Sequence, residues 1–408
     1  MINALDTVSD YDLQIGDKKL TDDQKLDVVE ISFEEKIGYT SSVRAIIRDS
    51  DEMSLAFDDL KFGTPVTFSL GWFGAKQTLF KGTIISPSPT FKANAPGQVE
   101  ITAYDAGFNM KSPRNPGFMH GTTLFQLVRD VLERNKNPKD DKGKDLPAII
   151  DDYVIEHPQN ILQRWRVTDE EAGFALEDTD FGFLAKYASR TGYQVIVKYG
   201  GGQSIFYFVD PGYFTRLPQT FGVPLNGQFP MFNFYISPLE SDLGDDHGLV
   251  IYTFEPELRS PGQRAEVKVV SWCSVNATGA KYGTDQLSGM ALGPKERNLT
   301  RIYLETSPIP VLTIVGEVAQ SDEAAGILAK AELERRAREL VTGQVTMNGW
   351  VPLRAGQRHN FLLRSFKTFG QAFSGAYNIT GVKHSFTAGQ GFRTKFDVSR
   401  YVVNETTK

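Results

Sequence analysis

Two stretches of this 408-residue chain, one near each end, follow the same pattern. The run that starts at Gly63 is GTPVTFSL, and the run that starts at Gly356 is GQRHNFLL. In each run a glycine suited to a turn is followed by four residues and then an alternating strand. Two more strand-like segments follow each run, at 79–84 and 97–102 and again at 377–382 and 391–396. The pattern predicts two similar β modules, produced either by an ancient duplication or by chance likeness of short segments.

Bulk composition is that of a folded protein with a large core. Hydrophobic residues make up 40% of the chain and charged residues 23%, and the 12% of aromatic residues favours β structure. The net charge of −6 argues against a general nucleic-acid binder, although DNA could still pass through a channel in an assembly. A single cysteine, Cys273, excludes an intrachain disulfide, and we interpret it as a small buried hydrophobe.

Residues 1–112 are predicted to form the first β-barrel domain. Apolar residues alternate with polar ones around Leu13, Ile31 and Ala45, and turn residues separate the three runs. Antiparallel strands with one face in water have this rhythm. Short antiparallel strands that close on themselves avoid exposed edges, so a barrel is expected.

Residues 113–212 are predicted to form a small α/β insertion. A capping box at Thr123 begins one helix, and a second helix begins at Asp178 or Thr179 and ends at Gly192. A hairpin that turns at Gly200–Gly202 follows the second helix.

Residues 213–245 are rich in Phe, Pro and Asn, and we interpret them as an irregular crossover. Residues 246–408 are predicted to form the second β-barrel domain. It contains an excursion at 274–320 and a helix at 321–342, with Ser321 as its cap and Gly343 as its stop. The predicted fold class is therefore mainly β with an α+β insertion, in which two related β-barrel modules flank a small α/β domain.

No residue group has the spacing of a known chemical site, so we expect no catalytic, cofactor-binding or metal-binding residues. The five histidines lack metal-ligand spacing: His120, His157, His247, His359 and His384. One acidic cluster could form a metal loop, but it lacks EF-hand spacing and suits a solvated turn better. Its members are Glu240, Asp242, Asp245, Asp246 and His247. A second group could supply an acid and a base, although helix capping explains it more simply. It consists of Glu177, Asp178 and Asp180.

Three further features have both a functional and a structural interpretation. Gly200–Gly202 could cradle a phosphate, but they join two strands, so a hairpin turn is simpler. Arg335, Arg336 and Arg338 could grip nucleic acid, whereas ion pairs and the helix C-terminus account for them without a ligand. Phe and Tyr side chains within residues 206–236 could stack on sugars, or they could pack in a core or an interface.

Four stretches carry a resemblance to a known family. They are residues 80–84 with 104–105, 179–185 with 192–195, 324–340 with 353–356, and 375–384 with 392–396. Each motif is weak alone, but together they span nearly the whole chain. In the order and spacing of these motifs, the chain resembles the baseplate hub protein of contractile phage tails. It is similar in the same way to late control protein D and to the N-terminal half of VgrG.

The resemblance implies a structural virion protein without enzymatic activity. Hubs of this kind are homotrimers in which each chain supplies two tube-like barrels, so that six barrels join a six-fold tail tube to a three-fold central spike. The implied partners are a tail tube or tube-initiator protein, the central spike, baseplate wedge proteins and a tape measure protein, while phage DNA passes through the lumen without specific binding. The implied location is the virion tail baseplate, assembled in the host bacterial cytoplasm. A hub of a contractile injection system would have the same role, and the hub of a non-contractile siphophage tail is a further alternative.

The sequence departs from VgrG after the predicted second barrel, where no OB module or spike repeat follows. We therefore expect the spike to be a separate chain, and we place Tyr401, Val402 and Val403 at the spike-facing interface. One alternative remains open. A β-rich cell-wall hydrolase or carbohydrate-binding tail module would use the acids of residues 240–247 or the aromatics of residues 206–236.

Overall fold

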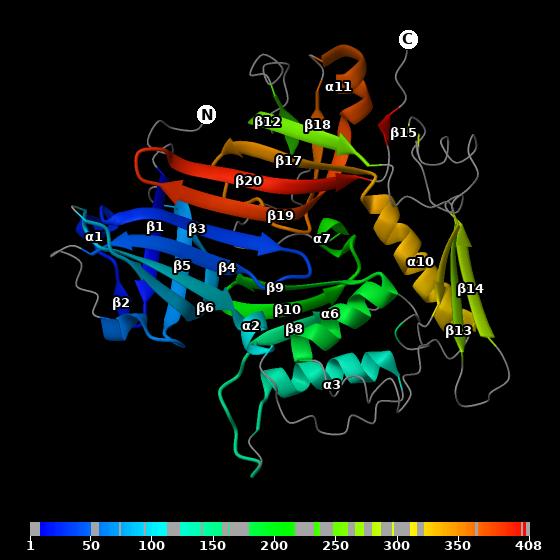
Figure 1. Ribbon diagram of the computed structural model, residues 1–408, viewed down its shortest axis with the longest axis horizontal. Helices are drawn as coiled ribbons and strands as arrows, with labels where there is room; N and C mark the ends of the chain where they lie inside the picture. Colours follow the sequence, from blue (N-terminus) through cyan, green and yellow to red (C-terminus); the bar gives the residue numbers. More distant parts are fainter. Residues whose placement is uncertain are drawn as a thin grey trace.

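The computed structural model of the protein is mainly β, and an α/β unit lies between two β modules in the chain (Figure 1). The fold class predicted from the sequence is therefore confirmed. The structure describes residues 9–49, 57–72, 75–93, 95–111, 123–139, 142–156, 162, 179–216, 232–236, 248–259, 266–272, 280–286, 296–297, 311–315, 322–363, 366–400 and 403–404.

The first β module is a curled antiparallel sheet around one apolar core. Its strands are β1 (Ser9–Ile15), β2 (Lys18–Lys19), β3 (Val28–Lys36), β4 (Ser42–Arg48), β5 (Pro65–Trp72), β6 (Ala75–Thr90) and β7 (Gln98–Asp105). They lie in the order β3-β4-β7-β6-β5-β1-β2. Three short helical segments accompany them: α1 (Asp22–Lys25), η2 (Phe57–Leu60) and α2 (Ala106–Asn109). Leu13, Ile31 and Ala45 are fully buried in this core, as their alternation predicts.

The second β module is a closed barrel of six strands. They are β11 (Asn233–Tyr235), β12 (Gly248–Leu258), β17 (Val341–Asn348), β18 (Arg358–Leu362), β19 (Gly375–Thr387) and β20 (Gly391–Arg400), with helix α11 (Lys367–Phe373) between β18 and β19. The order β18-β11-β12-β17-β20-β19 returns to β18 through a direct β18–β19 pairing. Strand β11 closes the barrel because it pairs in parallel with both β12 and β18. Phe361 lies at the centre, with ring centroids 5.1 Å from Phe234 and 4.9 Å from Phe254.

The glycine turns of the two modules make the same pair of hydrogen bonds. The N–H of Gly63 donates to the carbonyl of Ile84 at 2.8 Å, and Ile84 returns a bond to the residue after the glycine at 2.9 Å. In the second module, Gly356 donates to the carbonyl of Ile379 at 2.8 Å, and Ile379 returns the same bond at 2.8 Å. Both glycines have positive φ angles, 84° and 89°, which L side chains rarely adopt. Gly63 therefore corresponds to Gly356, and Ile84 to Ile379.

A β-bulge follows each of these isoleucines. Strand β6 shifts register against β7 between Ile84 and Ser86, and β19 shifts against β20 between Ile379 and Gly381. A bulge bends a strand at one particular residue, so matching bulges align the two modules residue by residue.

A second pair of bulges completes the correspondence. Strand β3 shifts against β4 between Val28 and Glu30, and β12 shifts against β17 between Ile251 and Thr253. The modules thus match strand for strand: β3 with β12, β4 with β17, β5 with β18, β6 with β19 and β7 with β20. Agreement in turns, bulges and register favours duplication over chance likeness.

The modules join edge to edge through β19 and β3. The antiparallel pairing runs from Gly381 opposite Lys36 to Thr387 opposite Glu30, and it fuses both modules into one 13-stranded sheet. Phe386, near the end of β19, packs on the core of the first module, with its ring centroid 5.0 Å from that of Tyr11.

The α/β unit lies below this sheet in Figure 1. Its sheet has the order β8-β10-β9, from β8 (Asp152–Ile155), β9 (Gln194–Gly200) and β10 (Gln203–Val209). Its helices are α3 (Leu124–Lys136), α6 (Asp180–Thr191) and α7 (Tyr213–Arg216). The predicted helix starts are confirmed. The hydroxyl of Thr123 accepts from the N–H of Gln126 at 3.3 Å and caps α3, and the hydroxyl of Thr179 accepts from the N–H of Gly182 at 3.1 Å and caps α6. Gly192 ends α6 with φ 80°.

A third sheet lies within the long connection between β12 and β17. Its order is β14-β13-β16, from β13 (Glu266–Trp272), β14 (Ala280–Gln286) and β16 (Val311–Val315), and α10 (Asp322–Arg338) follows it. A two-stranded pairing joins β15 (Glu296–Arg297) to β21 (Val403–Asn404). Val267, Val269 and Leu333 share one core with α3 and α6, so this connection packs on the α/β unit.

Two sequence interpretations of this half of the chain were wrong. Helix α10 ends at Arg338, and Gly343 lies inside strand β17 instead of stopping the helix. A Cβ at Gly343 would lie 3.0 Å from the carbonyl oxygen of Glu255, so the glycine serves close approach of β12. The predicted crossover at 213–245 includes strand β11, which closes the barrel.

Candidate functional site

The acidic groups singled out in the sequence divide between described and undescribed residues. Residues 240–247 lie outside the described part of the chain, as do Glu177 and Asp178. Asp180 is buried at the start of α6, where it accepts hydrogen bonds from Arg134 Nε at 3.0 Å and Asn135 Nδ2 at 2.6 Å. This carboxylate ties the end of α3 to the start of α6, and it faces the positive end of the α6 dipole. Its contacts suit the structural interpretation.

The glycine and arginine motifs also have structural partners. Gly201 and Gly202 form the β9–β10 turn with φ angles of 61° and 86°, which confirms the predicted hairpin. Arg335 pairs with Glu332 at 2.8 Å, and Arg338 pairs with Glu334 at 2.9 Å. Ion pairs within α10 therefore account for these cations, as the simpler interpretation predicted.

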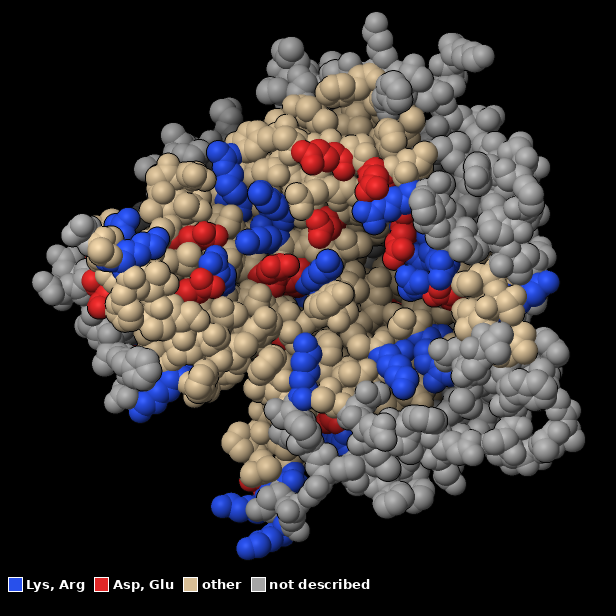
Figure 2. Space-filling model, viewed as in Figure 1, with Lys and Arg blue, Asp and Glu red and all other residues tan. Residues whose placement is uncertain are grey.

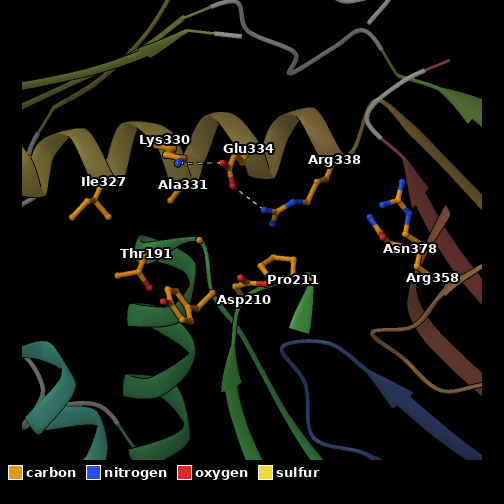
Figure 3. A pocket seen from close by; sticks show the side chains of 13 residues that line it. Thr191, Asp210, Pro211, Ile327, Lys330, Ala331, Glu334, Arg338, Arg358 and Asn378 are labelled. Carbon is orange, nitrogen blue, oxygen red and sulfur yellow. Dashed lines mark hydrogen bonds and ion pairs between the residues drawn. The ribbon is translucent and has the colours of Figure 1, made fainter. Parts of the chain in front are cut away.

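Figure 3 shows the cleft between α10 and the end of β10. Lys330, Glu334 and Arg338 form a chain of ion pairs along α10. Burial lowers the pKa of Arg338, while the negative charges of Glu334 and Asp210 oppose that shift. Because acids and bases are mixed, the cleft lacks the single sign of charge that an anion site would use. Lys and Arg are likewise interspersed with Asp and Glu on the face seen in Figure 2.

Most of the described aromatic side chains of residues 206–236 are buried in cores. Phe206, Phe208 and Phe234 are fully buried, and Tyr207 and Phe214 pack together with ring centroids 5.1 Å apart. Side chains in these positions cannot stack on a sugar at the surface without unfolding. The described aromatics therefore favour the packing interpretation.

Two histidines are buried and neutral in the second module. Burial lowers the pKa of His359 to about 3 and that of His384 to about 4. His384 Nε2 lies 3.0 Å from the carbonyl of Leu353, and Nδ1 lies 2.9 Å from the hydroxyl of Thr394. Since a carbonyl only accepts, Nε2 carries the proton and Nδ1 accepts from the threonine. His120, His157 and His247 lie outside the described residues.

A buried ionic cluster joins all three parts of the fold. Glu35 on β3 accepts from Lys198 Nζ of β9 at 2.8 Å and from Arg354 Nε of the β17–β18 loop at 2.9 Å. It also accepts from the backbone N–H of Ala355 at 2.9 Å, and Lys198 donates to the Ala355 carbonyl at 2.7 Å. The first module, the α/β unit and the second module thus each supply one charge.

Burial and charge oppose each other at this cluster. Burial by itself would raise the pKa of Glu35, but the charges of Arg354 and Lys198 hold it down to about 2. Burial lowers the pKa of Lys198 to about 8, although Glu35 opposes that shift. Asp105 lies in the same region, and its burial raises its pKa to about 7 against the hydrogen bonds it accepts.

Sequence analysis missed this cluster, although one signal was available. Glu35 follows Phe33 at a spacing of two residues, which places it on the buried face of β3. Perturbed pKa values and clustered charges are also typical of active sites. Glu35 has no exposed surface, however, and Lys198, Arg354 and the Ala355 backbone together donate to both of its carboxylate oxygens. The arrangement suits a structural tie between the three parts.

The described residues give no support to a metal site or a membrane span. Among them, no three His, Cys, Asp or Glu side chains could hold a metal ion together. None of the helices in the described ranges is long and apolar enough to cross a bilayer. Val403 lies in β21, opposite Arg297, while Tyr401 and Val402 lie outside the described residues.

The geometry defines a scaffold: two equivalent β modules joined edge to edge, with an α/β unit locked to both by buried charges. Solved structures with a similar fold include two tail proteins and a VgrG complex. The 43 kDa tail protein of prophage MuSo2 from Shewanella oneidensis matches with a TM-score of 0.62 at 13% identity, over 96% of this chain and 98% of that chain. The tail protein from Neisseria meningitidis MC58 matches with a TM-score of 0.58 at 13% identity, over 96% of each chain.

A chain of the half-lidded PdpA–VgrG complex from Francisella matches with a TM-score of 0.53 at 10% identity. The match covers 98% of this chain and 60% of that chain. No protein-family model matches the sequence, and no curated protein matches it. At these identities the likeness shows a shared fold.

Proposed function

We propose that this protein is a structural component of a tail baseplate: a homotrimeric hub that joins a six-fold tail tube to a three-fold central spike. One observation carries the proposal. The two β modules of a single chain correspond in turns, bulges and register. Three copies of such a chain present six near-equivalent modules, and a ring of this kind can meet six-fold symmetry on one side and three-fold symmetry on the other.

The proposed role is structural and not enzymatic. The charged clusters of the described residues are occupied by their own ion pairs and hydrogen bonds, and the fold is that of tail proteins. The proposed partners are further copies of this chain, the tail tube or its initiator, the central spike, baseplate wedge proteins and a tape measure protein. Phage DNA would pass through the lumen without specific contacts. The protein would assemble in the host cytoplasm and reside in the virion tail, or in the same position of a contractile injection system.

Negative-stain electron microscopy of the purified chain tests the proposal. Class averages viewed along the axis are expected to show a three-fold torus with six lobes. A folded chain that stays monomeric, even when mixed with tube or spike proteins, would contradict it. The domain boundaries at residues 112, 212 and 245 and the spike-facing role of Tyr401, Val402 and Val403 belong to the same proposal, and cross-linking to a spike protein tests that role.

A further inference from the structure

The junction inside the chain shows how one module meets the next. There, the end of β19 lies along β3, and Phe386 pairs with Ile31. Phe386 also packs against Tyr11, so an aromatic ring at a strand end fills the mouth of the neighbouring module. Because the modules correspond strand for strand, the same two partners exist a second time: the end of β6 corresponds to β19, and the edge of β12 corresponds to β3.

Residue correspondence identifies the second aromatic ring. Phe386 lies seven residues beyond Ile379, and Phe91 lies seven residues beyond the equivalent Ile84. Phe386 is packed, whereas the side chain of Phe91 is 80% exposed. An exposed phenylalanine at the position of a docked one indicates a surface that awaits a partner.

The matching mouth in the second module is an open apolar cleft. Ile31 lies three residues beyond Val28, and Phe254 lies three residues beyond the equivalent Ile251. Phe254 lines the cleft together with other apolar side chains, of which Tyr252 and Phe366 are 47% and 49% exposed. The other apolar lining residues are Ile236, Pro256, Leu363 and Phe373. Strand β12 pairs with β11 only at residues 248–250, so among the described strands nothing lies along its edge at residues 253–258.

We propose that Phe91 of one copy docks into this cleft of a second copy, with the edge of β6 lying along the edge of β12 in the register of the β19–β3 junction. In that register Phe91 lies opposite Phe254, and Thr90 lies opposite Glu255. Lys92 is then diagonal to Glu255, an attractive pair of charges. The inference rests on the proposed trimer, for which it names the contact between copies.

Prolines make this contact selective. In the internal junction the N–H of Ala388 donates to Val29, so every second residue of β19 points its N–H toward β3. The equivalent positions in β6 include Pro87 and Pro89, which have no N–H to donate. Prolines on an edge discourage indiscriminate strand pairing. Docking therefore depends on Phe91 and its cleft more than on a full ladder of hydrogen bonds.

Designed disulfides test the register. The test variant combines Thr90→Cys with Glu255→Cys in a Cys273→Ser background. In the proposed register the Cα atoms of the two cysteines are about 4.5 Å apart, which is within the range that a disulfide bridges. Oxidation with diamide should produce covalently linked dimers and trimers on non-reducing gels. The control pair Ser88→Cys with Glu255→Cys is two residues out of register, and it should cross-link several-fold less. Equal yields from both pairs, or linkage from neither, would overturn the proposal.

Substitution of the ring tests the anchor. Phe91→Asp should reduce the trimer fraction in native mass spectrometry by about tenfold or more, because the charge cannot enter an apolar cleft. Leu146→Asp is the control, since Leu146 is 43% exposed and lies in the loop that follows α3 in the α/β unit, and it should assemble like the parent chain. Circular dichroism verifies that both variants fold.

The outcomes separate this inference from the proposed function. Rings that persist in Phe91→Asp, without linkage of the in-register cysteines, would refute the docking mode while the hub proposal stands. A parent chain that forms no ring, even with tube or spike proteins, would refute the hub proposal and the docking mode together.

Discussion

Substituting Glu35 by Gln should destabilise the whole protein, because this carboxylate is the only anion among the described residues that directly pairs with two buried cations. Glu35 accepts from Lys198, from Arg354 and from the backbone of Ala355. Glutamine keeps the shape of the side chain and one acceptor oxygen, but it removes the negative charge and turns an amide toward positive groups. Lys198 and Arg354 then face each other in a desolvated region without a counter-ion.

The expected cost is large for a single substitution. Removing one partner of a buried ion pair typically destabilises a protein by about 3–5 kcal/mol. Domains have unfolding free energies of about 5–15 kcal/mol, so Glu35→Gln should remove about a fifth or more of that stability. Glu34→Gln is the matched control, because its side chain is exposed on the same strand, and a surface charge of this kind contributes about 0–1 kcal/mol.

Urea titrations of both variants provide the measurement. Glu35→Gln should also lower the pKa of Lys198 further below about 8, since the opposing charge has gone. The folded chain would then lose the Lys198 proton at a lower pH, while the unfolded chain still holds it. The rise in stability with pH should therefore begin at a lower pH than in the parent protein. If Glu35→Gln and Glu34→Gln unfold within about 0.5 kcal/mol of each other, the reasoning about the buried cluster is wrong.

Three further predictions concern single residues. Burial raises the pKa of Asp105 to about 7, so the folded state binds this proton more tightly than the unfolded state does. The contribution of Asp105 to stability therefore falls as pH rises from about 4 to about 7. Asp105→Asn should flatten that part of the pH profile in urea titrations. Gly356→Ala should cost more than Gly38→Ala in thermal melts, because both glycines have positive φ but a Cβ at Gly356 would also lie 2.5 Å from the ring of Phe214; equal costs would contradict the assigned clash. Phe361→Ala should lower the free energy of unfolding by about 3–5 kcal/mol, since the ring fills the centre of the barrel, and a loss below about 1 kcal/mol would show that the barrel core is not packed as described.

Much of the β architecture was predictable because local patterns determine it. Alternation around Leu13, Ile31 and Ala45 indicated the strands of the first module, and Thr123 and Thr179 marked two helix starts. The repeated glycine turns predicted the second module, and the structure extends that likeness to bulges that no sequence pattern revealed.

The remainder depends on contacts between distant parts of the chain. Local rules would exclude Pro87 and Pro89 from a strand. Strand β6 nevertheless continues through them, because their ring nitrogens lie on an edge that no other described strand pairs with. Strand β11 has only three residues, and its place is set by β12 and β18 on either side. The partners of Glu35 lie 163 and 319 residues away, so no local window contains the cluster.

The β3–β19 junction also has a consequence for synthesis. Strand β3 ends at Lys36, but its partner ends at Thr387, so the pairing has to wait until about 350 further residues have been translated. At about 5–20 residues per second, the β3 edge is without its native neighbour for roughly 20–70 s. During that interval Phe386 is absent from the core of the first module, and the unpaired edge can recruit strands from other nascent chains. The yield of folded chain should therefore depend more on the rate of translation and on chaperone supply than on the stability of the finished protein.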